Sequence, residues 1–111
     1  MIQQEIRDKR TFLIEKLKKE NVFWPYESGS VKNDDLSDDF LIEKTLIHLD
    51  ISEINILFAI LPKKEIRRVW EEKMLPQGEY LFNLNKFLAW FYFDIHNDDE
   101  YVRENAYKRL A

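Results

Sequence analysis

The sequence predicts an all-α fold, a single compact domain built from five or six short helices. Its 111 residues suit one ordinary domain, and 45% of them are hydrophobic and 14% aromatic, which is enough to build a core. Only two glycines and three prolines interrupt the chain. Disorder and an all-β fold with many turns are therefore disfavoured. We expect an N-terminal helix within residues 1–20, a loop over 21–36 and a helical body over 37–111.

The N-terminal helix, over residues 3–20, is predicted from the spacing of its apolar residues. They fall within about 60° of one another on a helical wheel, and the opposite face is charged. These residues are Ile2, Ile6, Leu13 and Leu17. The loop that follows contains Pro25 and begins with three aromatic residues, Phe23, Trp24 and Tyr26. Because exposing apolar surface to water costs about 25 cal/mol per Å², we expect these three side chains to fold back onto the domain.

Two helices of the body have clear start signals. Ser37 can cap a helix over 38–49, since a serine side chain accepts a hydrogen bond from the first turn. Asp50, followed three residues later by Glu53, has the spacing of a capping box and predicts a helix over 51–61.

Pro62 ends that helix and can occupy the first position of the next one, over 62–74. The apolar residues of this segment follow one another at spacings of 3, 1 and 4, which places them on a single face. They are Ile66, Val69, Trp70 and Met74. We expect this face to be buried and Trp70 to lie in the core.

The segment over 79–95 is unusually aromatic, and as a helix it would have two apolar faces. One face carries Tyr80, Leu84, Phe87, Leu88, Phe91 and Ile95, and the nearly opposite one carries Phe82, Ala89 and Phe93. If the first face anchors the segment in the core, either a second layer of protein covers Phe82 and Phe93 or a partner does. Trp90 lies between the two faces, where interface aromatics are common. Phe82, Trp90 and Phe93 are therefore the candidate interface residues, for a protein partner or for a second copy of the chain.

A last helix is predicted over 99–110. Asn97 or Asp98 can cap it. Its inward residues are predicted to be Tyr101, Val102 and Ala106.

Four basic residues lie near the start of the helix over 62–74, where acidic residues would be more stable because of the helix dipole. They are Lys63, Lys64, Arg67 and Arg68. They are candidates for binding an anion or a partner. Alternatively, the chain's own acids answer them, either from the acidic turn (Asp34, Asp35, Asp38, Asp39) or from Glu71 and Glu72 at i,i+4. The same segment could also act as the recognition helix of a helix-turn-helix, although the connection before it is short.

Catalytic and metal-binding motifs are not found. The chain has no cysteine, its two histidines, His48 and His96, are far apart, and the acidic run around Asp35 lacks the glycine and glutamate of a calcium loop. No glycine-rich phosphate loop or nucleophile motif occurs. We therefore expect no cofactor, no metal and no enzymatic activity. The net charge of −4 disfavours nucleic acid as a partner, and the absence of a signal sequence or a long apolar run predicts a cytoplasmic protein without a membrane segment.

Four strings, in this order, resemble a family of small uncharacterised bacterial all-helical domains. They are FW at 23–24, LIEKTLIHLD at 41–50, KKEIRRVW at 63–70 and LN at 84–85, and the likeness covers residues 22–95. Members of this family are often encoded beside nucleotidyltransferase-like proteins of the abortive-infection type. The resemblance implies an antitoxin-like or accessory partner role. The function expected from the sequence is thus a non-catalytic protein-interaction module, and the alternative is a nucleic-acid-binding regulator that uses the basic helix.

Overall fold

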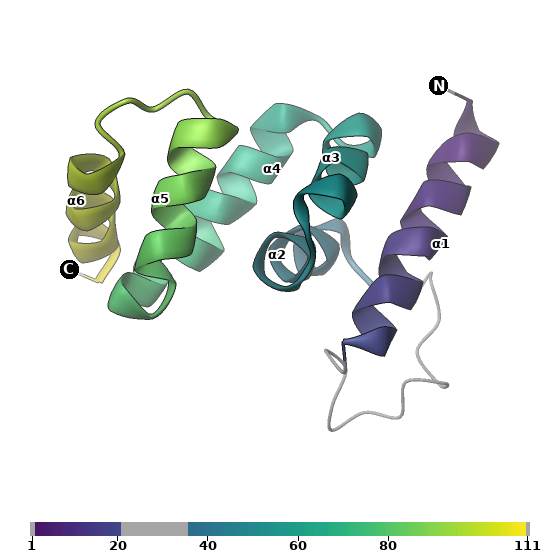
Figure 1. The fold of residues 1–111 in the computed structure, drawn as a ribbon, viewed down its shortest axis with the longest axis horizontal. Coiled ribbons are helices and arrows are strands. Elements are labelled where there is room, and N and C mark those ends of the chain that lie inside the picture. Colours follow the sequence, from purple (N-terminus) through teal and green to yellow (C-terminus); the bar gives the residue numbers. More distant parts are fainter. Residues whose placement is uncertain (1, 21–35, 111) are drawn as a thin grey trace. The chain divides into compact units, whose positions relative to one another are not determined.

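The computed structural model describes residues 2–20 and 36–110, with side chains through Ala106. Every regular element in these residues is helical, which confirms the all-α fold class (Figure 1). The helices are α1 (Gln3–Lys19), α2 (Asp38–His48), α3 (Ile51–Ile60), α4 (Lys63–Val69), the π-helical segment η3 (Trp70–Met74), the 3₁₀ segment η4 (Leu75–Leu81), α5 (Phe82–Phe91) and α6 (Asp98–Leu110). The predicted loop aromatics Phe23, Trp24 and Tyr26 lie outside the described residues.

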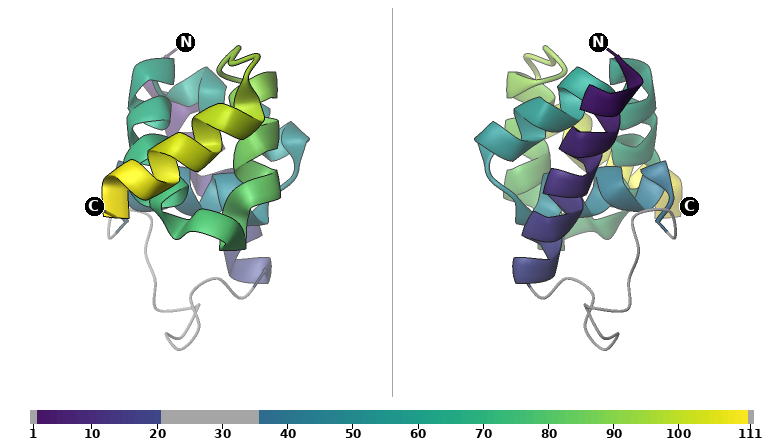
Figure 2. Two further views of the ribbon diagram at one scale, coloured as in Figure 1. Left: turned by 90° about the vertical axis from the view of Figure 1, so that its left-hand side faces the viewer. Right: turned by 90° about the vertical axis from the view of Figure 1, so that its right-hand side faces the viewer.

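The chain forms two compact units, Met1–Ile66 and Arg67–Ala111, and the boundary between them falls within α4. In the first unit, α1 packs against α2 and α3, and α2 packs against α3 (Figure 2). Its buried core comes from all three helices and includes Leu13, Leu17, Leu41, Leu46 and Leu57. The predicted inward residues Leu13 and Leu17 are confirmed, whereas Ile2, which precedes the first residue of α1, is exposed.

The start signals of α2 and α3 are confirmed. The Ser37 hydroxyl accepts a hydrogen bond from the Phe40 N–H at 3.1 Å. Asp50 and Glu53 form the reciprocal capping box that opens α3. Pro62 precedes the first helical residue of α4, and its carbonyl accepts hydrogen bonds from the N–H groups of Glu65 and Ile66. Pro62 is therefore the cap of α4 and not its first helical residue, the position predicted from the sequence.

The second unit is built around Trp70. α6 packs across α5 and η4, and η3 packs against η4 (Figure 2). Trp70, at the start of the π-helical segment, is fully buried, as are the other predicted face residues Ile66, Val69 and Met74. Its indole ring stacks on Phe93 at 4.7 Å and on Tyr101 at 6.1 Å between ring centroids. Trp70 is therefore the central core residue of this unit.

A buried asparagine fixes the position of the Trp70 ring. The Trp70 indole N–H donates a hydrogen bond to Asn85 Oδ1 at 3.1 Å, and the Asn85 amide donates in turn to the Met74 carbonyl, also at 3.1 Å. Asn85 is fully buried in α5. A buried polar group lowers the stability of the fold unless it is hydrogen-bonded. The two hydrogen bonds of Asn85 therefore favour one orientation of the Trp70 ring and hold α5 against the end of η3.

The aromatic segment differs from the predicted helix over 79–95. It begins in the 3₁₀ segment η4, where Gly78 has φ 61° and ψ −130°, and the α-helix runs only from Phe82 to Phe91. A positive φ with this ψ is a glycine conformation. Leu81, with φ −112° and ψ 18°, is not helical, so the helical phase of α5 does not extend back to Tyr80. Tyr80 is consequently 85% exposed, so its predicted place in the core is wrong.

The last helix agrees with the prediction to within a residue. α6 begins at Asp98, after the Asn97 carbonyl, which accepts a hydrogen bond from the Tyr101 N–H. Val102 and Ala106 are buried, and Tyr101 is half-buried against Trp70.

Candidate protein-interaction surface

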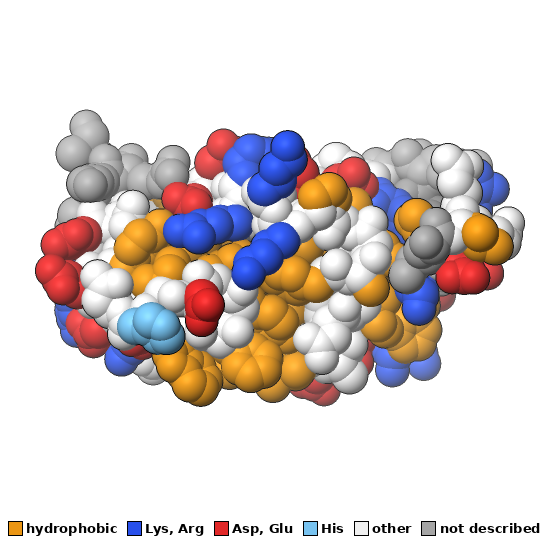
Figure 3. All heavy atoms as spheres, turned by 90° about the horizontal axis from the view of Figure 1, so that it is seen from above, with side chains coloured by type: hydrophobic (Ala, Val, Ile, Leu, Met, Phe, Trp, Pro, Cys, Tyr) orange, Lys and Arg blue, Asp and Glu red, His pale blue; other side chains and the backbone are white. Residues whose placement is uncertain are grey.

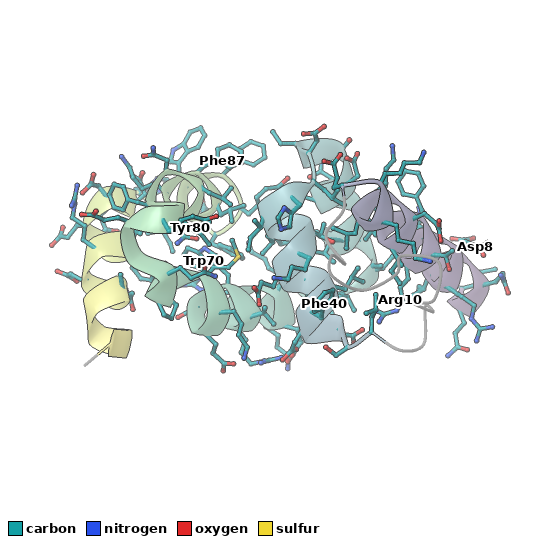
Figure 4. All side chains as sticks on the ribbon, turned by 90° about the horizontal axis from the view of Figure 1, so that it is seen from below. Asp8, Arg10, Phe40, Trp70, Tyr80 and Phe87 are labelled. Carbon is teal, nitrogen blue, oxygen red and sulfur yellow. The ribbon has the colours of Figure 1, made fainter. Side chains whose placement is uncertain are left out.

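Four aromatic side chains form a continuous cluster at the C-terminal end of α5. We call this set, Phe87, Trp90, Phe91 and Tyr92, the α5 aromatic cluster. The Phe91 ring is central, with centroids 5.2 Å from Phe87, 4.8 Å from Tyr92 and 6.1 Å from Trp90. Trp90 is 54% exposed and Phe91 is 48% exposed. In Figure 4, Phe87 points outward from α5, on the side away from Trp70.

The two other candidate interface residues have different surroundings. Phe93 is only 4% exposed, because it lies beyond the end of α5 and turns inward onto Trp70. Of the two alternatives left open by the sequence, Phe93 therefore follows the one in which the protein itself covers it. The prediction that Phe93 contacts a partner is therefore wrong, and Phe93 is a core residue.

Phe82 is half-buried beneath two cations of its own unit. The Arg103 guanidinium lies 4.5 Å from the ring centroid and the Lys86 ammonium 5.4 Å from it. Asp99 joins these cations, with ion pairs of 2.6 Å to Arg103 and 3.4 Å to Lys86. These two partners, Arg103 first, lower the pKa of the Asp99 carboxyl below its usual value. The Phe82 ring, a candidate interface residue, is thus partly covered by Arg103 and Lys86 of the same unit.

A shallow groove of about 400 Å³ lies between η4 and α6. It is lined by Gln77, Gly78, Glu79, Tyr80, Phe82, Arg103 and Ala106. One acidic and one basic side chain face it, and the Arg103 guanidinium is already paired with Asp99. The groove could not be predicted from the sequence, because the helical pattern over 79–95 places Tyr80 on the core-facing side.

Of the four basic residues near the start of α4, the two arginines form ion pairs and the two lysines are exposed. Arg67 and Arg68 are paired at i,i+4, with Arg67 Nε 3.0 Å from Glu71 Oε1 and Arg68 Nη1 3.1 Å from Glu72 Oε2. The expectation that Glu71 and Glu72 answer the arginines is confirmed. Hydrogen bonds from Arg67 to the Tyr101 hydroxyl and to Glu71 also raise the pKa of its guanidinium.

Lys63 and Lys64 are exposed, and no carboxylate of the described residues pairs with them. The acidic turn does not answer them through Asp38, which pairs with Arg10 of α1 at 2.6 Å. Asp34 and Asp35 lie outside the described residues. In Figure 3, the visible lysine and arginine side chains are interspersed with acidic and hydrophobic ones.

Nothing in the described part of the chain is arranged as a metal site, since no three His, Cys, Asp or Glu side chains come together there. Partial burial, and then Lys44 one turn earlier, lower the pKa of His48. None of the described helices is both long and apolar enough to cross a membrane.

No protein-family model, curated protein or solved structure matches the chain. The resemblance to the small bacterial helical family therefore stays a prediction. The choice among functions depends on the surface geometry alone.

Proposed function

We propose that the chain is a non-catalytic protein-interaction module whose contact surface is the α5 aromatic cluster. The supporting observation is the exposure of Trp90 and Phe91, two large apolar rings in mutual contact. They lie on α5, whose opposite side is buried through Asn85, Leu88 and Ala89. Exposed aromatic groups of this kind are enriched where proteins bind one another and dominate the binding energy there.

Within this proposal, the family resemblance suggests a more specific role. A protein that accompanies a nucleotidyltransferase of the abortive-infection type would bind it directly, in the manner of an antitoxin or an accessory subunit. The products of the genes next to this one are therefore the first partners to test.

The alternative of a nucleic-acid-binding regulator is less well supported. Ile66, Val69 and Trp70 of the basic segment are buried, and both of its arginines are paired with glutamates. Only Leu61 and Pro62 connect α3 to α4, whereas a helix-turn-helix uses a turn of about three or four residues. Lys63 and Lys64 are the cations left for phosphate contacts.

The double substitution Trp90→Ala/Phe91→Ser tests the proposed surface. The full chain and this variant are each used to capture the co-expressed neighbouring gene products, and affinities are then measured by titration. Because a hot-spot aromatic contributes about 2 kcal/mol or more, we expect the variant to bind at least about 30-fold more weakly than the wild type. The matched control is Phe12→Ala/Ile51→Ala, which removes two exposed hydrophobic side chains of the first unit and should bind normally.

Salt dependence separates this proposal from the alternative. Phosphate contacts lose about one unit of log-log slope each, whereas binding centred on aromatic rings keeps most of its affinity at moderate salt, even where charged groups flank the rings. Undiminished binding by Trp90→Ala/Phe91→Ser, or loss of binding in Lys63→Gln/Lys64→Gln with a steep salt dependence, would contradict the proposed function.

A further inference from the structure

We propose that the α5 aromatic cluster binds a basic amphipathic helix, a segment of a partner protein with apolar residues on one face and lysine or arginine beside them. This inference rests on the proposed function and adds the chemistry of the partner.

The apolar half of the inference follows from the contacts within the cluster. The Phe91 ring lies between the other two, with its centroid 6.1 Å from that of Trp90 and 5.2 Å from that of Phe87. The three rings therefore form one connected platform. An amphipathic helix offers a matching ridge, since its apolar residues at i, i+3, i+4 and i+7 share one face. The exposed faces of the rings also attract cations, and an indole does so best.

The basic half rests on the charged residues that come after the cluster in the sequence, up to the first turn of α6. Between Phe87 and Glu100 the chain has four carboxylates and no lysine or arginine. They are Asp94, Asp98, Asp99 and Glu100. Asp99 is paired with Arg103 and Lys86, while no cation within the described residues pairs with the other three. The carboxylates of Asp94 and Glu100 are exposed.

The end of α5 adds to this negative character. Phe91 is its last residue, so the partial negative charge of the helix C-terminus lies at the cluster. Asp94 follows with φ 58°, a left-handed conformation that aspartate tolerates and that turns the chain away from α5. The Ile95 N–H donates to the Ala89 carbonyl at 2.9 Å and holds this turn. Asp94 thus lies in the turn that directly follows α5, three residues after Phe91.

A second copy of the chain is a poorer occupant. A two-fold symmetric dimer across the cluster would place both copies of Asp94 and Glu100 around the same rings. Because the stretch from Phe87 to Glu100 has no lysine or arginine, the carboxylates of the two copies would face one another without a permanently charged counterion. A basic partner instead gains from each of these carboxylates.

Three synthetic peptides of about 18 residues test the inference. All have leucine at the i, i+3, i+4, i+7 spacing, and their polar positions are lysine, glutamine or glutamate. Binding of each labelled peptide to the full chain is measured by fluorescence anisotropy. We expect the leucine–lysine peptide to bind about tenfold or more tightly than the leucine–glutamine peptide and the leucine–glutamate peptide to bind most weakly.

Two charge variants separate a local effect from the net charge of the protein. Asp94→Asn/Glu100→Gln removes two exposed carboxylates that follow the cluster in the sequence, and asparagine still tolerates the left-handed conformation. It should weaken the leucine–lysine peptide about 3- to 10-fold. Glu5→Gln/Asp8→Asn removes two exposed carboxylates of α1 and should leave that affinity unchanged.

The outcomes distinguish the inference from the function on which it rests. Equal binding of the lysine and glutamine peptides, lost in Trp90→Ala/Phe91→Ser, would overturn the basic partner and keep the interaction surface. Peptide binding that this variant does not weaken would overturn both. A wild-type dimer in sedimentation that the same variant disperses would assign the surface to a second copy and overturn the inference.

Discussion

Trp70→Ala is expected to lower the free energy of unfolding by about 3 to 5 kcal/mol. The side chain is fully buried and stacks on Phe93 and Tyr101, so its removal leaves a cavity between α5 and α6. It also leaves Asn85 Oδ1 without its donor inside the core. Urea denaturation followed by far-UV circular dichroism measures the loss without relying on the tryptophan that is removed.

Trp70→Phe serves as the matched control. It keeps an aromatic ring in the stack but removes the indole N–H, so a smaller loss, about 1 to 3 kcal/mol, is expected from the unpaired asparagine and the reduced volume. A loss below about 1 kcal/mol for Trp70→Ala would show that the unit is not built around this residue.

Phe93→Ala is expected to cost a similar amount, about 3 to 5 kcal/mol, because the ring is buried against Trp70 and beneath the Arg67 guanidinium. Phe82→Ala should cost clearly less, since that ring is only half-buried. The comparison is made by chemical denaturation of the two single variants. If Phe93→Ala kept the wild-type stability, the correction of Phe93 from an interface residue to a core residue would itself be wrong.

The helix starts could be predicted because their signals are local. Ser37 and the Asp50 and Glu53 pair act within one turn of backbone, so the sequence alone specifies what they bond. The buried face of the predicted helix over 62–74 is also confirmed, and its residues are Ile66, Val69, Trp70 and Met74. The helix becomes π-helical only from Trp70 onward, and this change leaves the four side chains buried.

The aromatic segment could not be predicted in the same way. A helical wheel assumes one unbroken phase, but Tyr80 lies in a 3₁₀ segment that ends at the non-helical Leu81, and α5 ends before Phe93. The periodicity therefore assigns Tyr80 to the core, although it is exposed, and leaves Phe93 open to a partner, although it is buried. Asn85 was not recognised either, since an asparagine in a helix gives no sign of a buried partner such as the Trp70 indole, 15 residues away in sequence.

The candidate surface was predicted only in part. Trp90 is exposed as expected, but its neighbours in the cluster are Phe87, Phe91 and Tyr92 and not Phe82 and Phe93. The sequence assigned Phe87 and Phe91 to the anchoring face because they share it with Leu88, which is indeed buried. How far a helix face is covered depends on tertiary packing, which periodicity does not report.

The stability of the Trp90→Ala/Phe91→Ser variant tests most directly whether the α5 aromatic cluster is a surface and not part of the core. The free energy of unfolding is measured by urea denaturation at a protein concentration where the chain is monomeric. We predict a value within about 1 kcal/mol of the wild type, because both side chains are about half exposed. A loss of about 3 kcal/mol or more would show that these rings support the core and would contradict the proposed interaction surface.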